Sequence, residues 1–173
     1  KRSRLFLFWL LVFAREGYSE EFAVPNHGSP YLDLGGLGTG QILHLPTGTV
    51  VSLKQMMDSI SASRVIYIGE THDNIEAHKV QLRIIQLLTE KYQLAIGLEM
   101  FRRSAQEKLN LWHQGQLSQK EFKNLFHANW GKGFNLYQPI FEFAQSKNLP
   151  LIGLKSTREV ENTFRAGDPA PGD

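Results

Sequence analysis

Acidic and histidine side chains follow two short apolar runs, and their types and spacing could carry chemistry. The first run, 65–68, leads into Glu70 and His72, and the second, 95–98, leads into Glu99. Such runs are typical of buried parallel strands that deliver polar groups to the carboxyl edge of a sheet, where open α/β folds bind ligands. If the strands are neighbours, two acids and an imidazole meet there. This set could bind a divalent metal ion or act as a general acid and base.

Each of these residues also has a structural interpretation. Glu70 could cap the helix that follows it, and Glu99 could form an ion pair with Arg102 or Arg103. His78 lies near the start of the same helix, where the partial positive charge of the helix N-terminus favours a neutral, ligating imidazole. The alternative for His78 is a solvated helix residue.

Two further segments could contact a ligand. The segment 127–137 is rich in aromatic residues and glycine and contains Trp130 and Tyr137. Aromatic walls with a phenol suit a flat apolar ligand such as haem, for which tyrosine or histidine can be the axial ligand. A loop that closes over the core is the alternative. Lys155, at the end of a third apolar run, could neutralise the acids or bind a substrate carboxylate.

The composition excludes several classes of function. Nineteen basic and 17 acidic side chains leave a formal charge of +2, which disfavours nucleic-acid binding through a basic face. The absence of cysteine excludes disulfides, thiolate zinc sites, iron–sulfur clusters and cysteine nucleophiles. No GxSxG, phosphate-loop or HExxH motif occurs, so serine hydrolase, nucleotide-binding and zincin activities have no basis in the sequence.

The ends of the 173-residue chain are expected to lie outside its one domain. Residues 1–14 combine a basic start with an apolar run and predict a signal peptide, with an N-terminal anchor or a buried helix as the alternatives. Residues 15–40, which contain several glycines and prolines, predict a flexible N-terminal arm. Residues 166–173 predict a disordered tail.

The elements that must position the candidate residues alternate along the chain. Apolar runs at 41–45 and 49–51 around Gly48 predict a β-hairpin. Buried strands are expected at 64–68, 95–98 and 149–154, and helices are expected to begin at 52 and to span 75–92, 104–114, 118–127, 137–147 and 157–164. This order is typical of an α/β domain whose parallel sheet is joined by helical crossovers, here over 41–165. The early end of the last unit predicts a truncated domain.

These motifs, in this order, resemble the ChaN-like haem-binding family, whose superfamily also holds the Tiki proteases and the TraB/PrgY and erythromycin-esterase-like proteins. The resemblance rests on 69–74 with His78 and Gln81, on 97–101, and on 130–140. It runs from about residue 40 to residue 161 and covers about the first half of the family's domain.

The resemblance implies an exported protein, periplasmic or at the cell surface and associated with the membrane, that acts in haem or iron uptake. It implies haem as the cofactor, a homodimer with haem at its interface, and an uptake partner in the outer membrane. The residues expected to contact the cofactor are Tyr137, His72, His78 and Trp130. Many family members are lipoproteins, but a chain without cysteine has no lipid-attachment site.

Two alternatives stay open at this point. In the wider superfamily, GxxH-type motifs and paired acids serve metal-dependent hydrolysis. Glu70, His72 and Glu99 match those shared motifs, so in a Tiki-like peptidase they would be both the ligands of a divalent metal ion and the catalytic residues. The other alternative is an inactive fragment, because the family's second half, with its later histidine motif, is absent.

Overall fold

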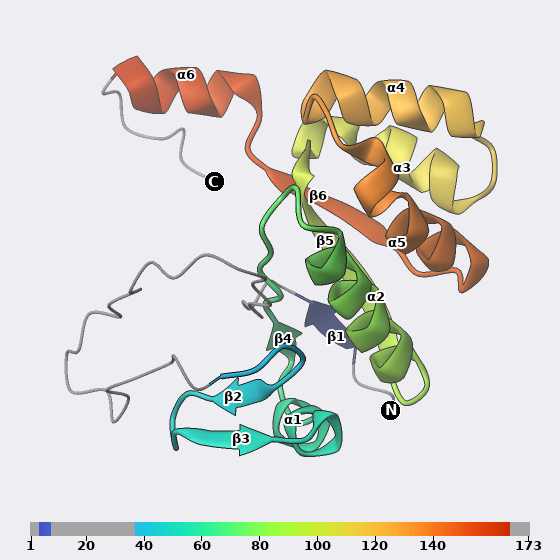
Figure 1. Cartoon of the computed structure of the whole chain (residues 1–173). Helices are drawn as coiled ribbons and strands as arrows, with labels where there is room; N and C mark the ends of the chain where they lie inside the picture. Colours follow the sequence, from blue (N-terminus) through green and yellow to red (C-terminus); the bar gives the residue numbers. More distant parts are fainter. Residues whose placement is uncertain (1–3, 8–36, 167–173) are drawn as a thin grey trace.

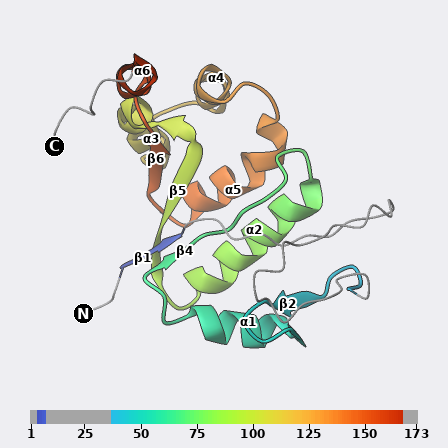
Figure 2. The same cartoon turned by 90° about the vertical axis from the view of Figure 1, so that its left-hand side faces the viewer.

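The computed structural model describes residues 4–7 and 37–166. Within this part of the chain, a parallel sheet packs against helices, and a separate two-stranded hairpin lies beside the first helix at the opposite end from α3 and α4 (Figures 1 and 2). None of the helices found there is long and apolar enough to cross a membrane. The expected α/β class, with a hairpin and a parallel sheet, is confirmed.

The central sheet contains parallel strands in the order β4-β1-β5-β6. These are β1 (Arg4–Leu7), β4 (Val65–Ile66), β5 (Gln93–Arg102) and β6 (Leu151–Lys155). The hairpin pairs β2 (Ile42–His44) with β3 (Thr49–Val51) in antiparallel register. The three strands expected in the sheet are therefore present, but β5 continues well past residue 98, where the sequence predicted its end.

Strand β1 lies inside the segment that was expected to be a signal peptide. It occupies the position between β4 and β5, with Phe6 opposite Val65 on one side and Ala95 on the other. An apolar sequence suits a strand with parallel neighbours on both sides. The rest of 1–14, most of the arm at 15–40 and nearly all of the tail lie outside the described residues, so these three segments stay predictions.

Hydrogen bonds from side chains define where several helices begin. The helices are α1 (Leu53–Ile60), α2 (Ile75–Thr89), α3 (Gln106–His113), α4 (Gln119–Asn129), α5 (Phe134–Ser146) and α6 (Arg158–Ala166), with a 3₁₀ turn, η1, at Arg103–Ala105. Ser52 and Ser118 form capping boxes with Gln55 and Glu121. The side-chain oxygen of Asn74 accepts hydrogen bonds from the first amides of α2. Asn74, rather than Glu70, therefore caps this helix.

Helix α5 begins three residues earlier than the sequence predicted. Gly133 precedes it with φ 86°, a left-handed conformation that favours glycine and turns the chain into the helix at Phe134. Pro139 consequently lies inside α5 rather than in its first turn. The longer helix carries Tyr137 toward the carboxyl end of β4.

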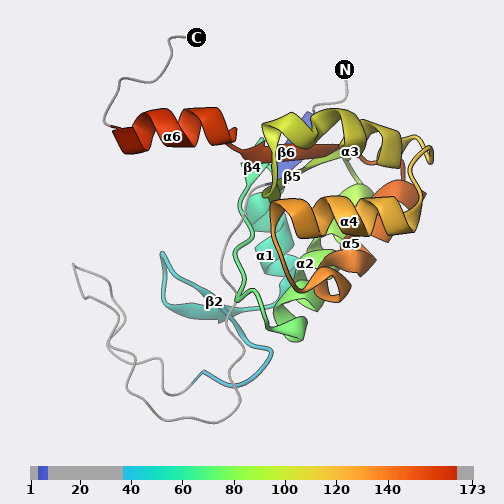
Figure 3. The same cartoon turned by 90° about the horizontal axis from the view of Figure 1, so that it is seen from above.

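The core lies between one face of the sheet and the helices α2 to α5. Ile66, Ile68, Ile96 and Leu98 from the sheet are buried there, together with a cluster of aromatic rings from β5, α4 and α5. Helix α6 differs from the others because it buries no residue and projects away from the body of the molecule (Figure 3).

Candidate functional site

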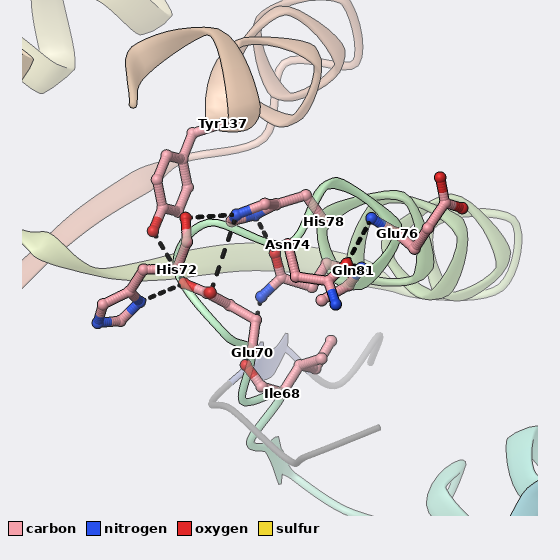
Figure 4. A network of polar contacts seen from close by, with 9 residues as sticks. Ile68, Glu70, His72, Asn74, Glu76, His78, Gln81 and Tyr137 are labelled. Carbon is pink, nitrogen blue, oxygen red and sulfur yellow. Dashed lines mark hydrogen bonds and ion pairs between the residues drawn. The ribbon is translucent and has the colours of Figure 1, made fainter. Parts of the chain in front are cut away.

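A buried carboxylate, Glu70, is the centre of a polar cluster that follows strand β4 (Figure 4). The Glu70 side chain is only 1% exposed, whereas that of His72 is 58% exposed. Glu70 Oε1 accepts a hydrogen bond from the Tyr137 hydroxyl at 2.8 Å and lies 2.7 Å from His72 Nδ1. Tyr137 comes from α5, so this oxygen connects two elements that are far apart in the sequence.

The second carboxylate oxygen of Glu70, Oε2, lacks such hydrogen bonds. Oε2 is buried and has no hydrogen-bond partner among the described residues. Its neighbour is His78 Nε2 at 3.8 Å, on a ring that is 2% exposed. Because an isolated buried carboxylate is costly, the imidazole of His78 is the group placed to offset the charge at this oxygen.

The ring of His78 is held by acceptors on both sides. Its Nδ1 lies 3.0 Å from Gln81 Oε1, and its Nε2 lies 3.3 Å from the backbone oxygen of His72. The amide of Gln81 is oriented by the hydrogen bond that Nε2 donates to the backbone oxygen of Ile68 at 3.5 Å. These contacts fix the orientation of the ring, with Nε2 on the side that faces Glu70 Oε2.

Tyr137 is a donor to Glu70 and is itself buried, with 2% of its surface exposed. Burial, and then the hydrogen bond to Glu70 and the negative charge of Glu70, raise the pKa of Tyr137 far above its usual value, against a smaller opposing effect of the Trp130 side chain. The phenol is therefore protonated at neutral pH. In this conformation the Tyr137 hydroxyl is hydrogen-bonded to Glu70 and is not accessible to a ligand as large as haem.

The side chain of His72 is exposed and contacts the half-buried side chain of Trp130. Their rings meet edge to face, with centroids 4.9 Å apart at an angle of 81°. In Figure 4 the second nitrogen of the His72 ring points away from the cluster. Lys155 Nζ, from the end of β6, lies 5.7 Å from the Trp130 ring centroid. An exposed imidazole, a half-buried indole and an ammonium group thus lie next to one another.

Trp130 is positioned by the last turn of α4. Asn129 accepts a hydrogen bond from the backbone N–H of Arg102 and donates one to the backbone oxygen of Leu125. These contacts fix the end of α4 against β5. The Trp130 amide completes the helix by donating to the backbone oxygen of Phe126.

Glu99 makes no hydrogen bond or ion pair with the described residues of this cluster, although its negative charge also contributes to raising the pKa of Tyr137. It lies within β5, where the alternation of side chains leaves it exposed between the buried residues Leu98 and Met100. The expected ion pair with Arg102 is also absent, because Arg102 instead contacts Glu161 at 2.7 Å. The sequence analysis placed Glu99 at a strand end, and β5 is longer than that.

The expected metal set of Glu70, His72 and Glu99 is therefore not assembled. Over 37–166, no group of three or more histidine, aspartate or glutamate side chains is arranged to bind a metal ion. Of the cofactor-binding candidates, His72 is exposed and Trp130 is half-buried, whereas His78 and Tyr137 are buried around Glu70. The sequence analysis assigned no role to Gln81, although its spacing from His78 on one helix face was a usable signal.

Comparisons with known proteins give two matches. A family model described as "Haem-binding uptake, Tiki superfamily, ChaN" matches residues 56–170, which include the whole cluster. The fold is similar to that of a solved structure titled "Cofacial heme binding to ChaN of Campylobacter jejuni", with a TM-score of 0.63 and 20% sequence identity. The match covers 77% of this chain and 55% of that chain, so this chain spans about half of its length. No curated protein matches the sequence.

Proposed function

Because this chain belongs to the ChaN family of haem-binding uptake proteins in the Tiki superfamily, we propose that it binds haem on the surface formed by His72 and Trp130. The proposal rests on how the two nitrogens of the His72 ring are placed. One ring nitrogen contacts a buried carboxylate at 2.7 Å, and the other points away from the cluster on a side chain that is 58% exposed.

The donor set fits a haem group. A histidine that donates its Nδ1 proton to a carboxylate keeps a lone pair on Nε2, and this is the form that binds iron. The half-buried indole of Trp130 lies edge to face with that imidazole and adds an apolar side chain to the site. Lys155, close to the same indole, supplies a cation for a ligand carboxylate such as a propionate. Bound there, haem would supply the iron chemistry, and the protein would supply orientation and charge.

Under this proposal, two residues expected to contact the cofactor have a supporting role. Tyr137 and His78 are buried on opposite sides of the Glu70 carboxylate, and their rings also contact each other with centroids 4.4 Å apart. Both hold Glu70 in place, and Glu70 holds His72. His72 and Trp130 are then the residues that contact haem.

A haem titration of the purified protein, followed at the Soret band, tests the proposal. We expect a saturable Soret shift for the unchanged protein and a loss of at least about tenfold in affinity for His72→Ala, because the axial ligand is removed. His44→Ala, on the distant hairpin, is the matched control and should bind as the unchanged protein does. Equal affinities of the His72 variant and the unchanged protein would exclude this surface.

The wider role implied by the family is also a proposal. We infer that the chain is exported to the periplasm or cell surface, associates with the membrane and an outer-membrane uptake partner, and passes haem or iron inward as part of uptake. The family's description as haem-binding uptake proteins supports this inference. Fractionation of cells that express the full open reading frame, followed by detection of the protein, tests the location.

A further inference from the structure

We propose that the side chains of Arg102, Lys155 and Ser156 form a binding site for a ligand carboxylate at the carboxyl edge of the sheet. Without such a ligand, Glu161 of α6 occupies the site in its place. This inference deepens the proposed function and rests on it, because the propionates of haem are carboxylates of this kind. It goes beyond the family's description, which assigns no residue to an anion.

The first argument is the position of two cations at neighbouring strand ends. Arg102 is the last residue of β5 and Lys155 is the last residue of β6, and the two lie opposite each other in the register of the sheet. Like charges that lie directly opposite each other are unfavourable, so an anion beside both stabilises the pair. The carboxyl edge of a parallel sheet is also where open α/β folds bind ligands.

The second argument is that a carboxylate already occupies this position. Arg102 Nη1 contacts Glu161 Oε1 at 2.7 Å, and the Ser156 hydroxyl donates to the same oxygen at 3.4 Å. The guanidinium of Arg102 is oriented by the hydrogen bond that it donates to the backbone oxygen of Ser156 at 2.8 Å. The hydrogen bond from Arg102 lowers the pKa of Glu161, and the positive charge of Lys155 adds to this effect. The site therefore has the donors and the charge that a carboxylate needs.

The third argument is that the helix carrying Glu161 is weakly attached. Helix α6 buries no residue, projects away from the body of the molecule (Figure 3) and leaves Phe164 64% exposed. Within the described part of the chain, Arg102 is the one residue outside 156–166 that forms a hydrogen bond or ion pair with α6. Such a partly exposed ion pair contributes little to stability. Displacement of Glu161 would therefore free α6 and leave the packing of the core unchanged.

The anion site adjoins the surface proposed for haem. Lys155 Nζ lies 5.7 Å from the centroid of the Trp130 ring, and the side chain of Asn129 accepts a hydrogen bond from the backbone N–H of Arg102. The ends of β5 and β6 are thus both close to the segment that carries the indole. A ligand that contacts Trp130 is next to Lys155, and Lys155 lies opposite Arg102.

The experiment compares haem with haem dimethyl ester, in which the propionates are esterified and carry no charge. Each compound is titrated into the whole chain and its variants in the same co-solvent, and the ratio of the two affinities is the measured quantity. Arg102→Met keeps an apolar side chain and removes the charge. We expect it to lower the preference for haem over the ester at least about threefold, because a charge-assisted hydrogen bond is lost.

The opposite change is expected when the internal carboxylate is removed. Glu161→Gln should raise the affinity for haem at least about threefold and leave that for the ester unchanged, because a charged competitor for Arg102 is lost. A purely structural role of the ion pair predicts no gain in haem affinity. Glu159→Gln, the same substitution at an exposed glutamate on the same helix, is the matched control and should change neither affinity.

Hydrogen exchange of the α6 amides is a second, independent measurement. Saturating haem should lower the protection of α6 in the unchanged protein, because a propionate displaces Glu161, whereas saturating ester should not. If Arg102→Met does not fold, Glu161→Gln and this measurement still decide. Equal protection with haem and with the ester would contradict the displacement of Glu161.

The outcomes separate this inference from the proposed function. Haem binding that depends on His72, combined with the same preference for haem over the ester in the unchanged protein, Arg102→Met and Glu161→Gln, would overturn the anion site alone. A lower haem affinity in Glu161→Gln would show that Glu161 supports the site and does not compete with the ligand. The absence of a Soret shift with both compounds would overturn the proposed function and this inference with it.

Discussion

At the scale of single residues, the cluster shows how a buried charge is accommodated. Removing a carboxylate such as Glu70 from water costs several kcal/mol, and this cost is offset only when hydrogen bonds and an opposite charge are in place. Here Tyr137 and His72 donate to one oxygen, and the His78 ring lies beside the other. Ionisable side chains that are buried and held by such contacts are common at functional sites, because catalysis and binding use their charge.

The contribution of Gln81 to this cluster can be tested by mutation. It is 3% exposed and links His78 Nδ1 to the backbone oxygen of Ile68. Gln81→Leu should destabilise the protein by roughly 1–3 kcal/mol, because both partners are left buried without a hydrogen bond. Urea unfolding measures this change. Gln138→Leu, which loses only a contact with Glu142 on its own helix, is the control, and equal stabilities of the two variants would contradict the role of Gln81.

Some residue contacts could be predicted from the sequence and others could not. The pairing of Glu70 with His72 is local, and the pattern of an apolar run followed by glycine, acid and histidine predicts it. The hydrogen bond from Tyr137 to Glu70 joins residues 67 positions apart, so tertiary structure, including the packing of α5 against α2, brings them together. Tyr137 could be identified as a candidate, but its burial and its partner could not be predicted.

At the scale of elements, boundaries decide which side chains meet. The order of strands and helices follows from apolar periodicity and from the capping boxes at Ser52 and Ser118. Glu99 lies within β5 rather than after it, and the apolar run at 95–98 gives no sign that β5 continues to Arg102. That extension depends on pairing with β6, in which Arg102 lies opposite Lys155 past an irregularity in the register. A single-sequence pattern does not contain this tertiary information.

Helix α6 is the element whose attachment depends on charge. Arg102 donates to the backbone oxygen of Ser156 and contacts Glu161 at 2.7 Å. The hydrogen bond from Arg102 holds the pKa of Glu161 below its usual value. Since the pKa is lowered in the folded state, this contribution to stability is complete above the usual glutamate pKa of about 4.3 and is lost as the pH falls through the lower, folded value.

We therefore expect α6 to loosen in acid before the core unfolds. Hydrogen exchange of the α6 amides, measured from about pH 6 to about pH 3 and corrected for the intrinsic pH dependence, should show protection that decreases as Glu161 is protonated. In Glu161→Gln, the protection should be low across the whole range. Protection of α6 that stays constant with pH in the unchanged protein would show that other contacts hold the helix.

At the scale of the whole molecule, the proposed haem surface is open on one side. Under this proposal, His72, Trp130 and Lys155 would provide a nitrogen ligand, an apolar wall and a cation, and the His72 side chain is 58% exposed. A haem group held there would expose much of its apolar surface to water, which is unfavourable. A second copy of the chain, bringing its own haem, would cover that surface.

We accordingly expect haem to drive the formation of a homodimer. Light scattering should give the mass of a single chain without haem and twice that mass at saturating haem, because apolar surface is buried only when haem is bound. His72→Ala should stay monomeric under both conditions, while His44→Ala should dimerise as the unchanged protein does. A saturated protein that stays monomeric would mean that the open surface is covered in another way. A dimer of equal stability with and without haem would show that the interface does not depend on the ligand, and either result would separate dimer formation from haem binding.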